Sequence, residues 1–162
     1  MCSFPFCITT GSPLIVLKRS HQQPLEEPTD AIVTMRGTVH WAGGTKLDCQ
    51  NERGQSIDVD WEEGPSPMQI FLQMIGACSI VDVVVGLKNR EFGKVWVDLD
   101  ADRRSEKPRS FTKVNMVYHV EGDVPEKLVR RTIEKSHEKY CSVSNSLSDD
   151  IEIAWELIIY DK

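Results

Sequence analysis

Apolar and polar residues alternate in short runs between residues 32 and 61, the spacing typical of half-buried strands. Gly43 and Gly44 form a turn signal between the first two runs, and a second turn signal at residues 51–54 precedes the third. The pattern therefore predicts strands over residues 32–41, 46–50 and 56–61, the first two paired as a hairpin.

The same alternation returns in the second half of the chain. It predicts strands over residues 95–101 and 114–120, joined as an antiparallel pair, and a last strand over 151–160. Between them a helix is expected from a capping box at Asp123 and Glu126 to residue 140, with Leu128, Ile133 and Tyr140 as its apolar stripe. The order βββ-α-ββ-α-β indicates an α+β fold. We expect a single domain over 31–162 after an N-terminal extension, residues 1–30, to which we assign no function.

Residues 67–90 are almost continuously apolar and are too long for one strand, so they are predicted as a helix. A transmembrane interpretation is disfavoured because Gln69, Gln73 and Asp82 fall on different faces, and an Asp in mid-span costs about 3 kcal/mol. We expect no membrane partner. A helix that is apolar all round needs cover on every side, and a second subunit supplies it most simply. This predicts a homodimer with the helix at its centre.

Composition narrows the class of protein. The 162 residues carry a net charge of −6, with Lys and Arg scattered, which argues against a nucleic-acid partner. The five cysteines are an odd number without a C-x-x-C pair, so neither a disulfide framework nor a zinc site is indicated. We expect a reducing, cytoplasmic location. A secretory signal is not expected, and organellar targeting by residues 1–30 is the remaining alternative.

Two cysteines stand beside other reactive side chains. Cys78 lies inside the long helix, one turn before Asp82, and apolar surroundings raise a thiol pKa, so Cys78 alone would be an inert core residue. Asp82 is either a proton acceptor for that thiol or a buried, paired carboxylate. Cys141 follows the 125–140 helix, where backbone N–H groups can point at its sulfur. His137, four residues earlier, is either an acid–base partner or a metal ligand, and because two ligands do not make a site we expect no metal. For Cys49, packing and exposure both stay open.

Several motifs together are similar to those of the OsmC/Ohr family of osmotically induced and organic-hydroperoxide-resistance proteins. The resemblance runs from about residue 33 to 160 and is carried by Ser66-Pro67-Met68, Gly76-Ala77-Cys78 with Asp82, Phe111-Thr112-Lys113, Gly122-Asp123 and Tyr140-Cys141-Ser142-Val143. It implies an OsmC-like fold, with antiparallel sheets packed on a long buried central helix in an intertwined homodimer.

The resemblance also implies a chemistry, that of a cysteine-based thiol peroxidase acting in redox defence. Cys78 would attack an organic hydroperoxide and become a sulfenic acid, and Cys141 would condense with it to a disulfide. An external dithiol of the lipoyl or thioredoxin type would reduce that disulfide, with no cofactor. The expected substrate pocket is lined by Met68, Phe71, Met74 and Ile75.

The chain departs from the family pattern at the groups that activate the first thiol. The family's Glu falls on Met68, and Thr45 and Lys46 stand where its Arg is expected. Arg36, Lys46 and Arg53 are the candidate replacement cations. The alternative function is an OsmC-fold redox sensor or small-molecule-binding protein without efficient peroxidase turnover. A further alternative is that Cys78 and Cys141 are structural, lie far apart and stay reduced.

Overall fold

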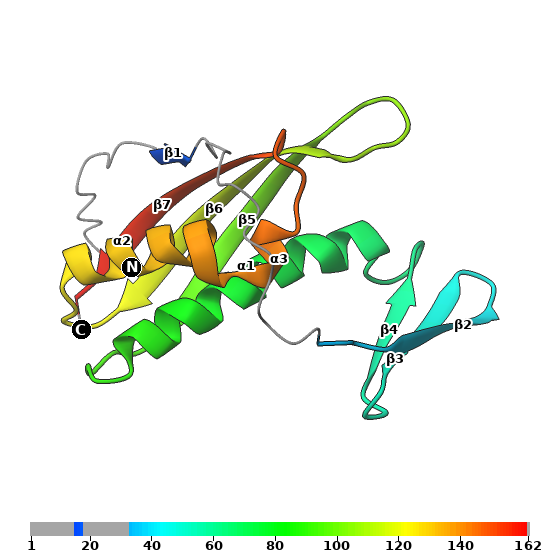
Figure 1. Cartoon of the computed structure of the whole chain (residues 1–162), viewed down its shortest axis with the longest axis horizontal. Coiled ribbons are helices and arrows are strands. Elements are labelled where there is room, and N and C mark those ends of the chain that lie inside the picture. Colours follow the sequence, from blue (N-terminus) through cyan, green and yellow to red (C-terminus); the bar gives the residue numbers. More distant parts are fainter. Residues whose placement is uncertain (1–14, 18–32, 162) are drawn as a thin grey trace, which may run out of the picture. The chain divides into compact units, whose positions relative to one another are not determined.

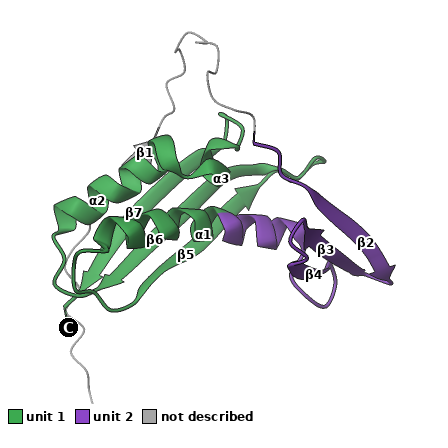
Figure 2. Cartoon of the chain, turned by 60° about the horizontal axis from the view of Figure 1, so that its bottom comes forward, with its two compact units in different colours: residues 1–18, 75–162 green, residues 19–74 purple. Residues whose placement is uncertain are grey.

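The computed structural model describes residues 15–17 and 33–161 of the chain. The chain divides into two compact units, one of residues 1–18 and 75–162 and the other of residues 19–74 (Figure 2). The predicted domain start at residue 31, and all but residues 15–17 of the predicted extension 1–30, lie outside the described residues.

The unit of residues 19–74 contains a three-stranded antiparallel sheet in the order β2 (Gly37–Gly43), β3 (Lys46–Asn51) and β4 (Ser56–Asp60). The predicted hairpin is confirmed: Gly43 and Gly44 turn the chain with φ angles of 97° and 56°, which glycine adopts without strain. Val39, Cys49 and Ile57 stand opposite one another across the three strands. This row lies on one face with Trp41 and Leu47, and Val39, Trp41 and Ile57 are exposed.

Helix α1 (Pro67–Leu87) confirms the long apolar helix. It begins with a capping box, since the backbone N of Gln69 donates to Ser66 Oγ at 3.4 Å and Gln69 Oε1 accepts from the backbone N of Ser66 at 2.8 Å. Within the described residues, α1 is long and apolar enough to cross a membrane by length and composition, a test that core helices of soluble proteins also pass. Its buried residues form one stripe, Ile75, Gly76, Ser79, Val83 and Leu87.

A second, four-stranded sheet carries the core of the other unit. Its order is β1 (Ile15–Leu17), β7 (Glu152–Tyr160), β6 (Phe111–Glu121) and β5 (Val95–Arg103). β5 and β6 are antiparallel, as predicted, whereas β7 runs parallel to β6. A parallel neighbour requires a crossover connection, and the helical segment between β6 and β7 provides it. Helices α1 and α2 lie on the same face of this sheet (Figure 1).

Glycine lets α1 approach its neighbours closely. A Cβ at Gly76 would lie 2.8 Å from Leu99 Cδ1 and 3.0 Å from Val97 Cγ1 of β5. A Cβ at Gly86 would lie 2.7 Å from Cγ2 of Thr132 in α2. Both positions therefore fix how near α1 packs to the elements that complete the candidate site.

The crossover consists of α2 (Glu126–Lys135), a π-helical turn η1 (Ser136–Tyr140) and α3 (Ser142–Asn145). The capping box expected at Asp123 is wrong: the N-cap is Pro125, without a side-chain hydrogen bond, and Glu126 instead pairs with Arg130 at 2.7 Å. The expected stripe is also wrong at Tyr140, which is exposed. The wider π turn shifts the helical register, so that Ser136 and His137 face the core instead.

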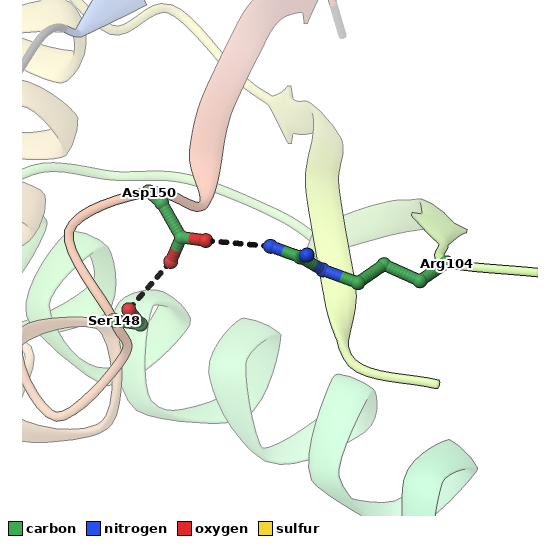
Figure 3. A network of polar contacts seen from close by, with 3 residues as sticks. All are labelled: Arg104, Ser148 and Asp150. Carbon is green, nitrogen blue, oxygen red and sulfur yellow. Dashed lines mark hydrogen bonds and ion pairs between the residues drawn. The ribbon is translucent and has the colours of Figure 1, made fainter. Parts of the chain in front are cut away.

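The far end of the β5–β6 hairpin is tied to the segment before β7. Arg104 Nη2 pairs with Asp150 Oδ2 at 2.9 Å, and Ser148 Oγ donates to Asp150 Oδ1 (Figure 3). The Ser148 hydroxyl and then Arg104 hold the pKa of the Asp150 carboxyl below its usual value. Both partners of this ion pair are exposed, so its contribution is mainly to position the loops.

Candidate active site

Helix α1 carries three polar side chains into the unit of residues 75–162. Ser79 is fully buried within the core stripe, whereas Cys78 and Asp82 are half-buried. The spacing of four residues between Cys78 and Asp82 places both side chains on neighbouring turns of one helix face. The only thiol on α1 therefore keeps some exposed surface, which a reacting group needs.

The π turn delivers the second thiol. The backbone N of Cys141 donates to the carbonyl of Ser136 at 2.8 Å, the i to i+5 bond that defines such a turn. Cys141 then serves as the N-cap of α3, because its sulfur accepts the backbone N–H of Ser144. The prediction that Cys141 follows the end of a helix, where N–H groups point at sulfur, agrees with this geometry.

Cys141 is fully buried, and its sulfur accepts two hydrogen bonds from one residue. The backbone N of Ser144 lies 3.3 Å from Sγ, and the Ser144 hydroxyl lies 3.1 Å away. Burial raises the pKa of the Cys141 thiol, and the two Ser144 bonds oppose that rise without cancelling it. Cys141 in this environment is a protonated thiol at neutral pH.

The two thiols are neighbours. Burial is the first cause of the raised pKa of Cys141, and the nearby Cys78 side chain raises it further. Both cysteines are free thiols in this structure, as is Cys49 on β3. A disulfide between Cys78 and Cys141 stays a prediction.

A chain of buried hydrogen bonds leads away from Cys141. The Ser144 hydroxyl lies 3.2 Å from Nδ1 of His137, and Nε2 of the same ring lies 2.9 Å from the phenolic oxygen of Tyr118. That oxygen lies 2.5 Å from Ser79 Oγ. Burial is the main cause that raises the pKa of Tyr118 well above its ordinary value, so its phenol stays protonated.

Asp82 ends this chain on the α1 side. Its Oδ2 accepts a hydrogen bond of 2.7 Å from Ser136 Oγ, which in turn lies 3.2 Å from Ser79 Oγ. The carboxylate is thus paired with a hydroxyl group, which offsets much of the cost of its partial burial. We call the residues Asp82, Ser136, Ser79, Tyr118, His137 and Ser144 the polar relay.

The other predicted site residues come from the unit of residues 19–74 and from α1. Arg36, Lys46 and Arg53 belong to the unit of residues 19–74, where Lys46 begins β3 and Arg53 lies in the turn before β4. Met68, Phe71 and Met74 lie on the first turns of α1, and Phe71 and Met74 are exposed. Ile75 is fully buried in the core. Activation of Cys78 by one of the three cations stays a prediction.

The sequence did not predict four members of the polar relay: Ser79, Tyr118, Ser136 and Ser144. Tyr118 stands in the apolar alternation of Val114, Met116 and Val120, where an aromatic residue reads as ordinary core. Serines next to a helix end read as caps. The available signal was a Tyr and three Ser on faces that are otherwise apolar, because buried hydroxyl groups need partners.

No group of three or more His, Cys, Asp or Glu side chains in the described residues is arranged to hold a metal ion. A surface pocket of about 380 Å³ lies beside the Arg104–Asp150 pair, lined also by Lys107, Phe111 and Ile151 among others. It contains none of the predicted site residues.

Comparison with known proteins places these residues in a wider group. A family model described as OsmC-like protein matches residues 60–156. Protein YhfA of Escherichia coli strain K12 is 35% identical over 125 residues, which cover 74% of this chain and 93% of that protein.

Solved structures share the fold. A hypothetical protein from Aquifex aeolicus VF5 matches with a TM-score of 0.70 and 28% identity, covering 79% of this chain and 98% of that one. An organic hydroperoxide resistance protein, OsmC, from Legionella pneumophila matches with a TM-score of 0.56 and 18% identity, covering 81% of this chain and 99% of that one. At 18% identity the likeness concerns the fold alone.

Proposed function

The chain belongs to the OsmC-like protein family, and from this premise we propose that it reduces organic hydroperoxides through Cys78 and Cys141. The family has an α+β fold with two small sheets and a long central helix, and it includes organic hydroperoxide resistance proteins. The observation that carries the proposal is the meeting of the two thiols, one half-buried and one fully buried, in one compact unit.

Exposure assigns the two roles. The Cys78 thiolate, which hydroperoxide can reach, attacks the terminal oxygen; the O–O bond breaks, and the alkoxide leaves and takes a proton to become an alcohol. Cys78 is then a sulfenic acid. The Cys141 thiolate attacks that sulfur, the S–S bond forms, the S–O bond breaks, and hydroxide leaves as water after taking a proton. An external dithiol returns both thiols by exchange.

A positive side chain near Cys78 would favour its thiolate, the form that attacks peroxide. Arg36, Lys46 and Arg53 are the candidates that the sequence offers, and Met68 stands where the family resemblance implies a Glu. Replacing each cation by Gln and measuring the rate of peroxide consumption identifies the one that acts. The expected result is a loss in one variant and near-normal rates in the other two.

The test of the proposal is consumption of cumene hydroperoxide with dihydrolipoamide as the reductant. Wild-type protein is expected to consume peroxide catalytically, and Cys78→Ser is expected to abolish consumption. Cys49→Ser is the matched control, since Cys49 lies on β3 and has no thiol opposite it in the strand register. Equal rates for wild type and Cys78→Ser would remove the proposal.

A second function, a redox sensor or small-molecule-binding protein without efficient turnover, is favoured by two observations. The pKa of Cys141 is raised by burial, which slows closure of the disulfide, and Met68 replaces the Glu of the family resemblance. This function predicts a disulfide that forms slowly, with no second-order consumption of peroxide. For either function, we propose that a thioredoxin-type dithiol in the cytoplasm returns the two cysteines to their reduced state.

The active form is proposed to be a homodimer in which a second copy covers α1. Val81 and Val85 of α1 are 59% and 56% exposed, and Val84 lies between them. On the three-stranded sheet, Val39, Trp41 and Ile57 are uncovered too. Monomeric proteins rarely leave two such apolar faces in water, and a symmetric pair covers the same faces on both copies.

A further inference from the structure

A buried thiol poses a problem for the proposed reaction. Cys141 attacks only as a thiolate, yet it is fully buried, and in the described residues its sulfur is hydrogen-bonded by Ser144 rather than by a cation. Its proton must therefore go to a nearby acceptor while the attack proceeds. Ser144 touches the sulfur, and His137 is the basic group directly behind it.

We propose that His137, acting through the Ser144 hydroxyl, takes the proton from Cys141 as Cys141 attacks the oxidised sulfur of Cys78. The inference deepens the proposed function and rests on it. Ser144 is a catalytic residue in this scheme because it contacts the reacting sulfur. His137 is a positioning and proton-holding residue that acts through Ser144.

Counting protons in the polar relay fixes its direction. The Asp82 carboxylate only accepts, so Ser136 donates its single hydroxyl proton to it at 2.7 Å. Ser136 Oγ could also donate to Ser79 Oγ, 3.2 Å away, but its one proton is used by Asp82, so in the relay the Ser79 hydroxyl donates to Ser136 and the Ser79 oxygen accepts from Tyr118. The Tyr118 oxygen is left as the acceptor for His137 Nε2–H, 2.9 Å away.

This direction leaves the lone pair of His137 on Nδ1, the nitrogen that faces Ser144. Neutral imidazole carries one N–H, and the Tyr118 oxygen accepts it at Nε2. In the structure the Ser144 hydroxyl donates to Cys141 Sγ at 3.1 Å, and its oxygen lies 3.2 Å from Nδ1. For the proton transfer the Ser144 hydroxyl turns to donate to Nδ1, and its oxygen then accepts the Cys141 thiol proton. With this order of donors from Ser136 to His137, Nδ1 is the acceptor toward which a proton can leave Cys141 through Ser144.

The step balances. The Cys141 proton moves to the Ser144 oxygen while the Ser144 proton moves to His137 Nδ1, giving a thiolate and an imidazolium. After transfer, the Ser144 hydroxyl donates to the thiolate, as its backbone N–H also does. The thiolate attacks Cys78 sulfur, the S–O bond breaks, and hydroxide takes a proton from solvent. The imidazolium returns its proton to solvent, so sulfenic acid plus thiol gives disulfide plus water.

The test separates this closure from peroxide chemistry by loading Cys78 with a different leaving group. Cys2, Cys7 and Cys49 are replaced by Ser, and the protein is mixed with 5,5′-dithiobis(2-nitrobenzoate). Loading of Cys78 releases one thionitrobenzoate in a phase that depends on reagent concentration. Attack by Cys141 releases the second in a phase that does not. That second phase measures the deprotonation and attack of Cys141.

His137→Gln and Ser144→Ala are each expected to slow the second phase by about 100-fold, within the range for loss of a general base, and to leave the first phase unchanged. The double variant should be no slower than either single one. Ser144→Thr keeps the hydroxyl and should stay within a few-fold of wild type, as should Ser142→Ala, whose exposed hydroxyl lies on the same short helix.

The pH dependence of the second phase distinguishes a role of His137 as a base from a purely structural role. In His137→Gln the second-phase rate should rise about tenfold per pH unit, because hydroxide replaces the lost base, while wild type rises less steeply. The titratable groups around the ring are Tyr118, Asp82 and the two thiols, with Glu138 and Lys139 exposed on its own turn.

Wild-type rates in both His137→Gln and Ser144→Ala would overturn the relay, as would a loss in His137→Gln that is equal at all pH values. If His137→Gln unfolds the chain, the comparison of Ser144→Ala with Ser144→Thr tests the relay by itself. If the wild-type protein consumes no peroxide but the two variants slow disulfide closure as expected, the proposed function is wrong and the relay stands. If the wild-type protein consumes peroxide but the variants close the disulfide at the wild-type rate, only the relay is wrong.

Discussion

The phenolic oxygen of Tyr118 and Nε2 of His137 lie 2.9 Å apart in a part of the core where the two residues are 0% and 3% exposed. Tyr118 comes from the middle of β6 and His137 from the π turn after α2. Their bond therefore ties the strand to the segment that presents Cys141. Two buried polar groups so joined are costly to separate, because neither can turn to water.

Replacing Tyr118 by Phe is expected to lower the free energy of unfolding by about 1–3 kcal/mol, because Ser79 and His137 lose a buried partner. Urea denaturation measures the change. Tyr140→Phe, at a 55% exposed position, is the matched control and should change stability by less than about 0.5 kcal/mol. Equal effects at the two positions would mean that the buried phenol contributes no net hydrogen bonding.

The approach of α1 to α2 is tested by a pair of substitutions. Gly86→Ala should destabilise the chain, because its Cβ would lie 2.7 Å from Thr132 Cγ2, and the Thr132 hydroxyl is held at 2.9 Å from the Leu128 carbonyl. Thr132→Ala removes the clash. In a double-mutant cycle, the two changes together should cost about 0.5–3 kcal/mol less than the sum of the single changes. Additive effects would mean that the two side chains do not touch and that the helices lie further apart than in the structure.

Stability should fall in alkaline solution. The pKa values of both Cys141 and Tyr118 are raised in the folded chain, so below about pH 8.5, the ordinary thiol value, their contributions are complete. Above that pH the unfolded chain releases the thiol proton first, and near pH 10 the phenolic proton, while the folded chain holds both. Urea unfolding with reductant at pH 7, 9 and 10 measures the decline.

The Cys141→Ser variant provides the control for that decline. It should remove the part between about pH 8.5 and 10, since serine does not titrate there, and keep the part due to Tyr118. Stability that rises with pH in this range would contradict the burial of the two groups.

The proposed dimer predicts an assembly that depends on α1. Val81→Glu places a charge on the uncovered apolar face and should shift sedimentation from a dimer to a monomer. Lys127→Glu, on the exposed face of α2, should leave the dimer intact. A wild-type chain that sediments as a monomer at micromolar concentration would contradict the assembly itself.

Alternation and helix length were sufficient to predict most of the fold. The strands β2 to β7 and α1 overlap the residues that the pattern indicates, because half-buried strands and a long apolar helix impose strong periodicity. The bounds are less accurate: β2 begins at Gly37 rather than residue 32, and α1 ends at Leu87 rather than residue 90. The pattern missed β1, whose three residues pair with β7 at the sheet edge. It also misplaced Tyr140, because the π turn adds one residue to a helical turn and no periodic rule anticipates it.

The sequence predicts some residues of the candidate site but not the contacts between them. Cys78, Asp82, His137 and Cys141 attract notice by residue type and spacing alone. The links between them do not, since Tyr118 and Ser79 come from different elements and touch only after β6 packs against α1. Ser136 and Ser144 resemble ordinary caps. Spacing along one helix therefore predicts neighbours on that helix, whereas contacts between elements depend on packing that a single sequence does not display.

Mass spectrometry of the chain after one equivalent of cumene hydroperoxide tests whether Cys78 and Cys141 are a redox pair. We expect a peptide pair linked through Cys78 and Cys141, and, in Cys141→Ser, a Cys78 sulfenic acid that dimedone traps. Recovery of both cysteines as free thiols, or a disulfide that joins Cys78 to a different cysteine, would contradict this expectation.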